Sequence, residues 1–170
     1  EVVDLRNFLD SLCSDMAAHC TFAPSDDVAV RLRPNAFRRA LRNLLENAVR
    51  YGGAAKVSWA THGSNLVLNI DDNGPGIPVD QLEKVFDPFY RLEQSRSLET
   101  GGYGLGLSIA RTIVQSHGGD IQLVNQNSAG LRAVVTIPLD ETELTEGETD
   151  ETERVDPAVA GQLARQHGAG

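Results

Sequence analysis

The chain has 170 residues, of which 41% are hydrophobic, and its 15 basic and 24 acidic side chains give a formal net charge of −9. This length suits one globular domain with an appendage better than two domains. The negative balance argues against a duplex-binding surface, which needs a clustered basic face. No apolar run approaches the roughly 20 residues that cross a bilayer, so we expect this chain to be soluble.

The predicted elements alternate between helices and strands. Apolar spacing and turn residues predict helices over Val2–His19, Asn35–Tyr51 and Leu105–Ser116, and strands over Val28–Leu32, Lys56–Ala60, Leu66–Ile70, Asp120–Val124 and Ala133–Leu139. Lys56–Ala60 and Leu66–Ile70 form a hairpin, Val79–Val85 is a short helix at best, and Phe86–Gly101 is a mobile loop. This order indicates an α+β fold, a two-layer α/β sandwich whose mixed sheet is covered on one face by helices.

Most of the charge lies in one segment near the end of the chain. Between Asp140 and Arg154, eight acidic residues accompany one arginine, a net charge of −7. We therefore expect a folded domain over residues 1–139 and an acidic, disordered tail over residues 140–170, with a short helix over 157–165. The tail is either a docking segment or a solubilising end, and its composition favours the second reading.

Cys13 and Cys20 are the only cysteines. If both lie seven residues apart on one helix, their Cα atoms are about 10 Å apart, beyond disulfide reach. We expect reduced, packed thiols of a cytosolic protein.

The helix predicted over Asn35–Tyr51 carries polar residues that its amphipathic pattern does not require. Leu41, Leu44 and Leu45 belong to its apolar face, and its outer side carries Arg38, Arg39, Arg42 and Glu46. Asn43 and Asn47 form an i, i+4 pair of amides, with Arg50 one turn further on. An amide oxygen is a suitable Mg²⁺ ligand beside substrate phosphates, and Arg50 could then meet those phosphates. The alternative is a polar helix edge facing solvent.

Two glycine-rich boxes follow. Asp72 ends a predicted strand and precedes Gly74 and Gly76, so its carboxylate could accept a hydrogen bond from the adenine amino group and would disfavour guanine. The alternative is an ordinary Asp-Asn-Gly turn. The second box, Gly101–Leu107, leads into a helix whose N-terminus could hold phosphate oxygens. It matches neither a P-loop nor a dinucleotide fingerprint.

In this order, the boxes NLLENAVRY, DDNGPGIP, FDPFYR and GGYGLGLSIA resemble the catalytic ATP-binding domain of sensor histidine kinases. That domain has the Bergerat-type fold shared with gyrase, a heat-shock chaperone class and mismatch-repair ATPases. The resemblance covers about residues 1–139. It implies ATP and Mg²⁺ as cofactors.

The resemblance also assigns residues. It implies that Asn47 is the metal ligand and that Asn43, Asn47 and Arg50 are catalytic. The nucleotide-binding residues that it implies are Asn47, Arg50, Tyr51, Asp72, Gly74, Gly76, Ile77, Phe89, Arg91, Arg96, Gly102, Tyr103, Gly104, Leu105, Gly106 and Leu107. Phe86–Gly101 would be the ATP lid, and Arg91 and Arg96 would contact phosphates.

Hydrolysing relatives place a glutamate one helical turn before the metal asparagine, where this chain has Asn43, an amide that cannot accept the proton. We therefore expect ATP to be held for transfer. None of the histidines, His19, His62, His117 and His167, stands in the kinase acceptor motif. The acceptor would then lie on a separate dimerisation domain of a sensor kinase.

The implied partners are that dimerisation and acceptor domain and a downstream response regulator, with no contact to nucleic acid or membrane by this segment. The implied location is the cytoplasmic side of an inner-membrane sensor protein. Two alternatives stay open, a stand-alone serine kinase like the anti-sigma-factor kinases and a docking module that only binds nucleotide.

Overall fold

A computed structural model describes residues 1–16, 19–23, 25–90 and 105–140. The helices are α1 (Leu5–Met16), α2 (Pro34–Gly52) and α3 (Gly106–Gln115), and two short 3-10 turns, η1 (Val79–Gln81) and η2 (Lys84–Phe86), precede α3. The strands are β1 (Val2–Asp4), β2 (Cys20–Phe22), β3 (Ala29–Arg31), β4 (Ala55–His62), β5 (Asn65–Asp71), β6 (Asp120–Asn125) and β7 (Leu131–Pro138). No helix in these ranges is long and apolar enough to cross a membrane.

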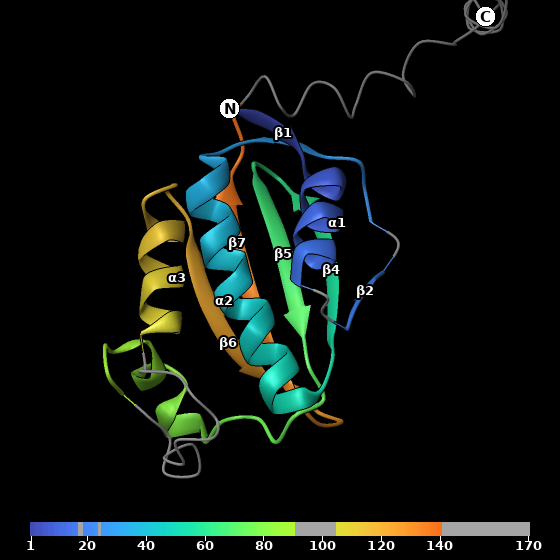
Figure 1. Cartoon of the computed structure of the whole chain (residues 1–170). Coiled ribbons are helices and arrows are strands. Elements are labelled where there is room, and N and C mark those ends of the chain that lie inside the picture. Colours follow the sequence, from blue (N-terminus) through green and yellow to red (C-terminus); the bar gives the residue numbers. More distant parts are fainter. Residues whose placement is uncertain (17–18, 24, 91–104, 141–170) are drawn as a thin grey trace, which may run out of the picture.

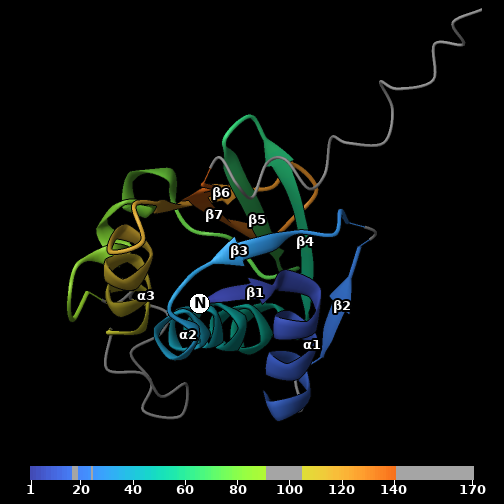
Figure 2. The same ribbon diagram turned by 90° about the horizontal axis from the view of Figure 1, so that it is seen from above.

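Five strands form one mixed sheet in the order β2-β4-β5-β7-β6. The β2 and β4 strands are parallel, and the other neighbours are antiparallel. Strands β1 and β3 form a separate antiparallel pair. Helices α1, α2 and α3 all lie on one face of the large sheet (Figures 1 and 2). The predicted fold class, a two-layer arrangement with a mixed sheet covered on one face, is confirmed.

Helix α2 crosses the middle of the covered face. Its buried side chains are Phe37, Ala40, Leu41, Leu44, Leu45 and Ala48, which recur at three- and four-residue steps as the sequence predicted. Pro34 occupies the first turn, where its missing N–H costs nothing. Gly53 ends the helix in the left-handed conformation, at φ 76°, and donates its N–H to the Val49 carbonyl. The boundaries predicted from Pro34, Gly52 and Gly53 are therefore confirmed.

The sheet buries every second residue along its central strands. On β5 the side chains of Leu66, Leu68 and Ile70 face the helices, and on β7 those of Ala133, Val135 and Ile137 do so. The predicted β4–β5 hairpin is confirmed, and its register pairs Trp59 with Leu68. Because β5 runs through the centre of the sheet, its carboxyl end delivers Asp71 and Asp72 to a fixed position beside the end of α2.

Two predictions for the first twenty residues are wrong. The helix predicted from Val2 begins only at Leu5, because residues 2–4 pair with β3 as a strand. Cys20 lies on β2 rather than on the same helix as Cys13, so helical spacing does not separate the two side chains. Burial first, and the neighbouring Cys20 second, raise the pKa of the Cys13 thiol to about 12, which keeps it protonated at neutral pH. Both cysteines are free thiols, as expected.

Several predictions concern residues outside those that the structure describes. They include most of the predicted ATP lid, with Arg91, Arg96, Gly102, Tyr103 and Gly104, and the acidic tail beyond Asp140 with its helix over 157–165. The helix predicted at Val79–Val85 is two separate 3-10 turns.

Replacing Leu45 with alanine should destabilise the domain by about 2–5 kcal/mol, because this fully buried α2 side chain would leave a cavity against the sheet. Urea denaturation would measure the free energy of unfolding. The neighbouring exposed residue Glu46 provides the control, since Glu46→Ala should change that free energy by no more than about 0.5 kcal/mol. Equal losses in both variants would mean that α2 does not carry the core.

Candidate nucleotide-binding site

The last turn of α2 lies directly against the first glycine-rich box. A Cβ atom built on Gly52 would come within 2.7 Å of Asp72 Cβ and 2.8 Å of the Asn73 backbone nitrogen, closer than real side chains approach. Across the same contact, a Cβ atom on Gly74 would lie 2.8 Å from the Tyr51 carbonyl oxygen. Only glycine at these two positions lets the helix and the turn meet backbone to backbone. Two of the sequence motifs therefore form one structural unit.

Asp72 is the only charged or polar residue among the described ones that is buried, with 8% of its surface exposed. Its Oδ1 atom accepts hydrogen bonds from the backbone N–H groups of Gly74, at 2.8 Å, and Leu131, at 3.2 Å. The Asp72 N–H in turn donates to the Leu131 carbonyl at 3.0 Å. None of the described residues donates a hydrogen bond to Oδ2, so this oxygen is available to accept one from a ligand.

Asn125, which the sequence did not single out, holds the other end of the same box. Its Oδ1 atom accepts the Ile77 N–H at 2.8 Å, and its Nδ2 atom donates to the Ile77 carbonyl at 2.6 Å. Gly76 has φ 74°, and a Cβ atom there would lie 2.6 Å from Asn125 Oδ1. The Asn125 side chain therefore bonds both backbone polar groups of Ile77, as a neighbouring strand would, and this fixes the turn from Gly74 to Ile77. In the sequence, Asn125 is one polar residue at the end of a predicted strand, a feature too common in proteins to predict this role.

Asn43 and Asn47 lie one turn apart on α2, and both are half-buried. Gly106, the first residue of α3, packs against the Asn43 side chain, since a Cβ atom on Gly106 would lie 3.8 Å from Asn43 Cγ. The helix N-terminus that follows the second glycine-rich box therefore faces the asparagine helix. Leu105 and Leu107, on either side of Gly106, are half-buried at this junction.

The remaining predicted residues surround this junction less closely. Arg50 and Tyr51 are exposed at the end of α2, Tyr51 with 44% of its surface accessible. Phe89 is 72% exposed and has φ 65°, a left-handed conformation that is rare outside glycine. The structure brings together Asn43 with Gly106, Tyr51 with Gly74, and Gly52 with Asp72, whereas Phe89 is exposed on the surface.

A metal at this site would have few charged ligands. No cluster of three or more His, Cys, Asp or Glu side chains suited to a metal occurs in the described ranges. Asn47 offers one half-buried amide oxygen. A single such ligand is compatible with Mg²⁺, because that ion is commonly held by one or two protein oxygens together with waters and substrate phosphates.

Arg111 on α3 ties the start of the predicted lid and the residues just before it to the sheet, although no sequence motif singles this residue out. Its guanidinium donates to Asp120 Oδ1 at 2.9 Å, pairs with Glu83, and lies over the Phe86 ring at 4.3 Å from the centroid. The hydrogen bond to Asp120 raises the pKa of Arg111 and lowers the pKa of Asp120. The FDPFYR box is thereby anchored through Phe86 to α3 and β6.

Comparison with known proteins supports this arrangement. Residues 32–141 match the family described as histidine kinase-, DNA gyrase B-, and HSP90-like ATPase. The chain belongs to this family. The matched range contains α2, both glycine-rich boxes and α3, and therefore every residue of the candidate site.

Related sequences include sensor histidine kinase GtrS of Pseudomonas aeruginosa, 43% identical over 106 residues, which span 62% of this chain and 22% of the relative. Sensor protein kinase WalK of Staphylococcus haemolyticus is 31% identical over 162 residues, 89% of this chain and 26% of the relative. The chain thus spans about a quarter of the length of these curated relatives.

Among solved structures, the ATP-binding domain of PrrB from Mycobacterium tuberculosis superposes with a TM-score of 0.67 at 28% identity. The match covers 82% of this chain and 97% of that domain. The resemblance to the catalytic ATP-binding domain of sensor histidine kinases is confirmed by these relatives together with the family match.

Removal of the Asn125 amide should loosen the glycine-rich turn. Asn125→Ala leaves the half-buried N–H and carbonyl of Ile77 without partners, and we expect a loss of about 1–3 kcal/mol in unfolding free energy. Hydrogen exchange at the Ile77 amide, followed by NMR, should accelerate together with that loss. Asn127→Ala, at an exposed position two residues away, is the control and should change neither quantity. Unchanged exchange at Ile77 in Asn125→Ala would contradict the clamp.

Proposed function

We propose that this chain binds Mg-ATP and donates the γ-phosphate to a histidine on a separate dimerisation and acceptor domain of a two-component sensor kinase. A response regulator would then receive the phosphate from that histidine. In such a protein the domain would lie on the cytoplasmic side of the inner membrane, where ATP is available. The family match supports ATP as the substrate, and the observation that carries the site is the buried carboxylate of Asp72.

Asp72 would select the base. Its Oδ1 atom accepts hydrogen bonds from two backbone N–H groups. These bonds hold the carboxylate in one orientation and so fix the position of Oδ2. A carboxylate can only accept hydrogen bonds, which suits the exocyclic amino group of adenine and opposes the carbonyl that guanine carries at the same position. Gly74 and Gly76 would let the flat base approach the backbone.

Asn47 would hold the metal from α2, and Arg50 one turn nearer the helix end would neutralise phosphate charge. A magnesium ion held there would supply positive charge that offsets the negative charge of the phosphates during transfer. The N-terminus of α3, which packs against Asn43 through Gly106, would offer its backbone N–H groups to phosphate oxygens. The chain's own contribution is then positioning and charge neutralisation rather than proton abstraction.

The side chains that could compete with transfer are unsuited to do so. Asn43 stands where a hydrolysing relative would need a carboxylate base, and an amide cannot accept the proton of water. His117 is already engaged, since its Nε2 accepts the Arg33 N–H at 3.1 Å and its Nδ1 lies 2.7 Å from the Ile113 carbonyl. These observations support a phosphate acceptor located on another domain.

Calorimetric titration should show saturable binding of Mg-ATP and no binding of Mg-GTP. Asp72→Asn should weaken ATP binding at least tenfold, because it replaces half of an acceptor-only group with a donor and perturbs the Gly74 and Leu131 hydrogen bonds. Asn47→Ala should weaken Mg-ATP binding while leaving metal-free nucleotide binding nearly unchanged. Asn69→Ala, on the opposite face of β5, is the control. No heat with the native chain would refute nucleotide binding.

Incubation with γ-labelled ATP should leave the isolated chain unlabelled, whereas a histidine-bearing acceptor domain added in trans should become labelled. Phosphohistidine is acid-labile, so loss of that label in acid would identify the acceptor chemistry. Acid-stable label would favour the serine kinase alternative. Label on a histidine of this chain would contradict the proposal.

A further inference from the structure

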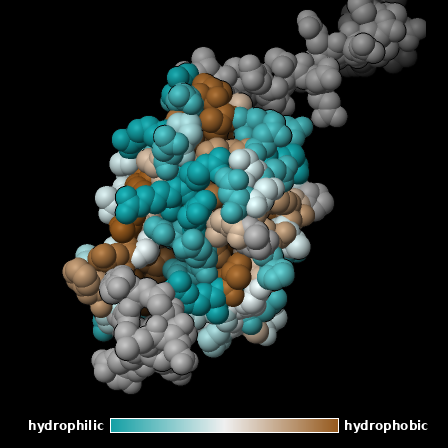
Figure 3. Space-filling view, viewed as in Figure 1, coloured by the Kyte–Doolittle hydropathy of each residue, from teal (hydrophilic) through white to brown (hydrophobic). Residues whose placement is uncertain are grey.

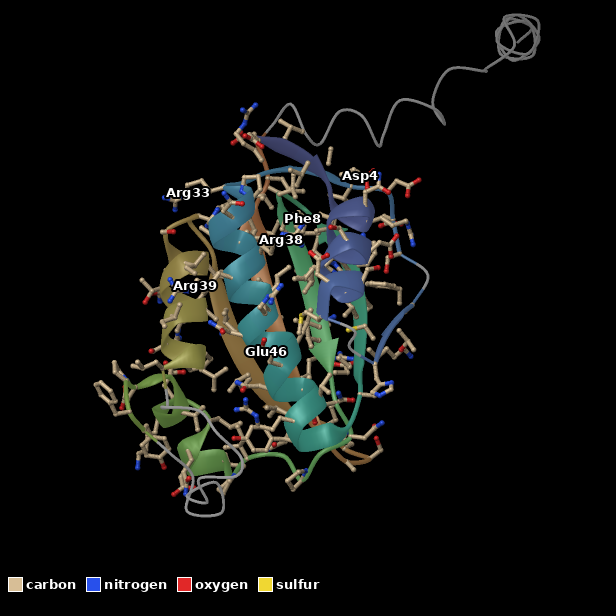
Figure 4. All side chains as sticks on the ribbon, viewed as in Figure 1. Asp4, Phe8, Arg33, Arg38, Arg39 and Glu46 are labelled. Carbon is tan, nitrogen blue, oxygen red and sulfur yellow. The ribbon has the colours of Figure 1, made fainter. Side chains whose placement is uncertain are left out.

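Six of the arginines lie close together in the sequence of a chain whose net charge is −9. Residues 31–50 contain Arg31, Arg33, Arg38, Arg39, Arg42 and Arg50, against a single acidic residue, Glu46. Hydrophilic side chains cover the outer face of α2, which looks away from the sheet (Figure 3). Figure 4 shows Arg38, Arg39 and Glu46 along this helix and Arg33 at its start. We call Arg33, Arg39 and Arg42 the arginine row.

The arginines of this stretch differ in whether a carboxylate lies beside them. Arg38 donates to Asp15 at 2.9 Å and lies over the Phe8 ring at 5.1 Å from the centroid. The Arg33 guanidinium donates to Ser116, a neutral residue, and has no carboxylate within 4.0 Å among the described residues. Arg39, which is exposed, and Arg42, which is half-buried, have no carboxylate within 4.0 Å in the part of the chain that the structure describes. The row therefore carries three positive charges that lack a negative partner there.

The acidic segment begins beside this row. Asp140, the last described residue, accepts a hydrogen bond from Arg31 Nε to its Oδ2 at 3.1 Å. Arg31, Arg33 and Asp140 line the same pocket of about 440 Å³, together with Ser116 and His117. In Figure 1, β7 ends at the same end of the molecule as the start of α2. The chain after Asp140 thus starts within reach of the first arginine of the row.

Length and charge of the following segment both match the row. Seven acidic residues follow Asp140, namely Glu141, Glu143, Glu146, Glu148, Asp150, Glu151 and Glu153. An extended chain advances about 3.3 Å per residue, so ten residues can span roughly 33 Å. A helix rises about 1.5 Å per residue, so the row from the start of α2 to Arg42 occupies only about 12 Å. Several of the carboxylates can therefore meet the three arginines at once.

We propose that residues 141–153 dock as an intramolecular polyanion on the arginine row, which consists of Arg33 just before α2 and of Arg39 and Arg42 on that helix. Each contact with an exposed arginine is weak, but tethering at Asp140 makes the binding intramolecular and raises the effective concentration of the carboxylates. This docking does not depend on the proposed kinase function, because neither Arg39 nor Arg42 belongs to the candidate nucleotide site.

Nitrogen-15 NMR of the full chain at low salt tests the proposal. Neutralising the segment in Glu143→Gln/Glu146→Gln/Glu148→Gln should shift the amide and arginine Nε signals of Arg39 and Arg42 more than those of the sheet. The same shifts should appear when about 0.5 M salt is added to the native chain, since ions screen exposed charges. Unchanged signals on α2 in both experiments would overturn the proposal.

Cleavage of the segment by a glutamate-specific protease gives an independent rate. If the segment is docked for two thirds of the time, Arg39→Gln/Arg42→Gln should accelerate cleavage about threefold, because cleavage follows the undocked population. Lys56→Gln removes a positive charge from an exposed β4 position on the open face of the sheet and should leave the rate unchanged. Equal acceleration by both variants would indicate only a general charge effect and overturn the proposal. A native rate that falls with rising protein concentration would place the segment on a second copy instead.

Discussion

The backbone contact between the end of α2 and the turn after β5 is the constraint on which the candidate site depends. Gly52 and Gly74 remove the two side chains that would keep the helix away from Asp72 and Asn73. With that contact in place, the asparagines of α2 and the carboxylate of Asp72 belong to one rigid unit. A larger residue at either position would separate the two groups that the proposed function needs together.

A buried carboxylate is stable only if protein groups replace the hydrogen bonds that it loses to water. Asp72 gains such bonds from backbone N–H groups of its own turn and of the start of β7, so its position depends on the pairing of β5 with β7. Asn125 at the end of β6 then fixes the far side of the same turn. Three strands thereby determine the shape of a loop of a few residues, which explains how a glycine-rich segment can present a fixed binding surface.

Charge is organised separately from this site. The Arg111 network links α3 to β6, to Glu83 and to Phe86 at the start of the predicted lid through one half-buried guanidinium. The arginine row, by contrast, begins with the exposed Arg33 near the point where the acidic segment begins, and continues on α2 with the exposed Arg39 and the half-buried Arg42. Helix α2 thus carries three groups of side chains, with leucines in the core, Asn43 beside the second glycine-rich box, and arginines on the outer side.

The sequence by itself determined the features that depend on neighbouring residues. Helical spacing in α2, alternation in β4 and β5, the glycine stops and the identity of the motif residues all follow from short-range patterns, and the structure confirms the elements. The family was also readable, because four motifs in a fixed order are specific. The error at Val2–Asp4 arose where a local helical pattern yielded to pairing with β3, more than twenty residues away.

Only the tertiary structure decided which distant residues complete the site. Asn125 is 48 residues from Ile77 in sequence, and Leu131 is 59 from Asp72, so no local pattern could indicate either contact. The same holds for Arg31 and Asp140, whose pairing brings the acidic segment to the start of α2. Composition showed that both charge clusters exist, but their proximity is a property of the fold, because strand order and helix packing bring together residues that the chain keeps far apart.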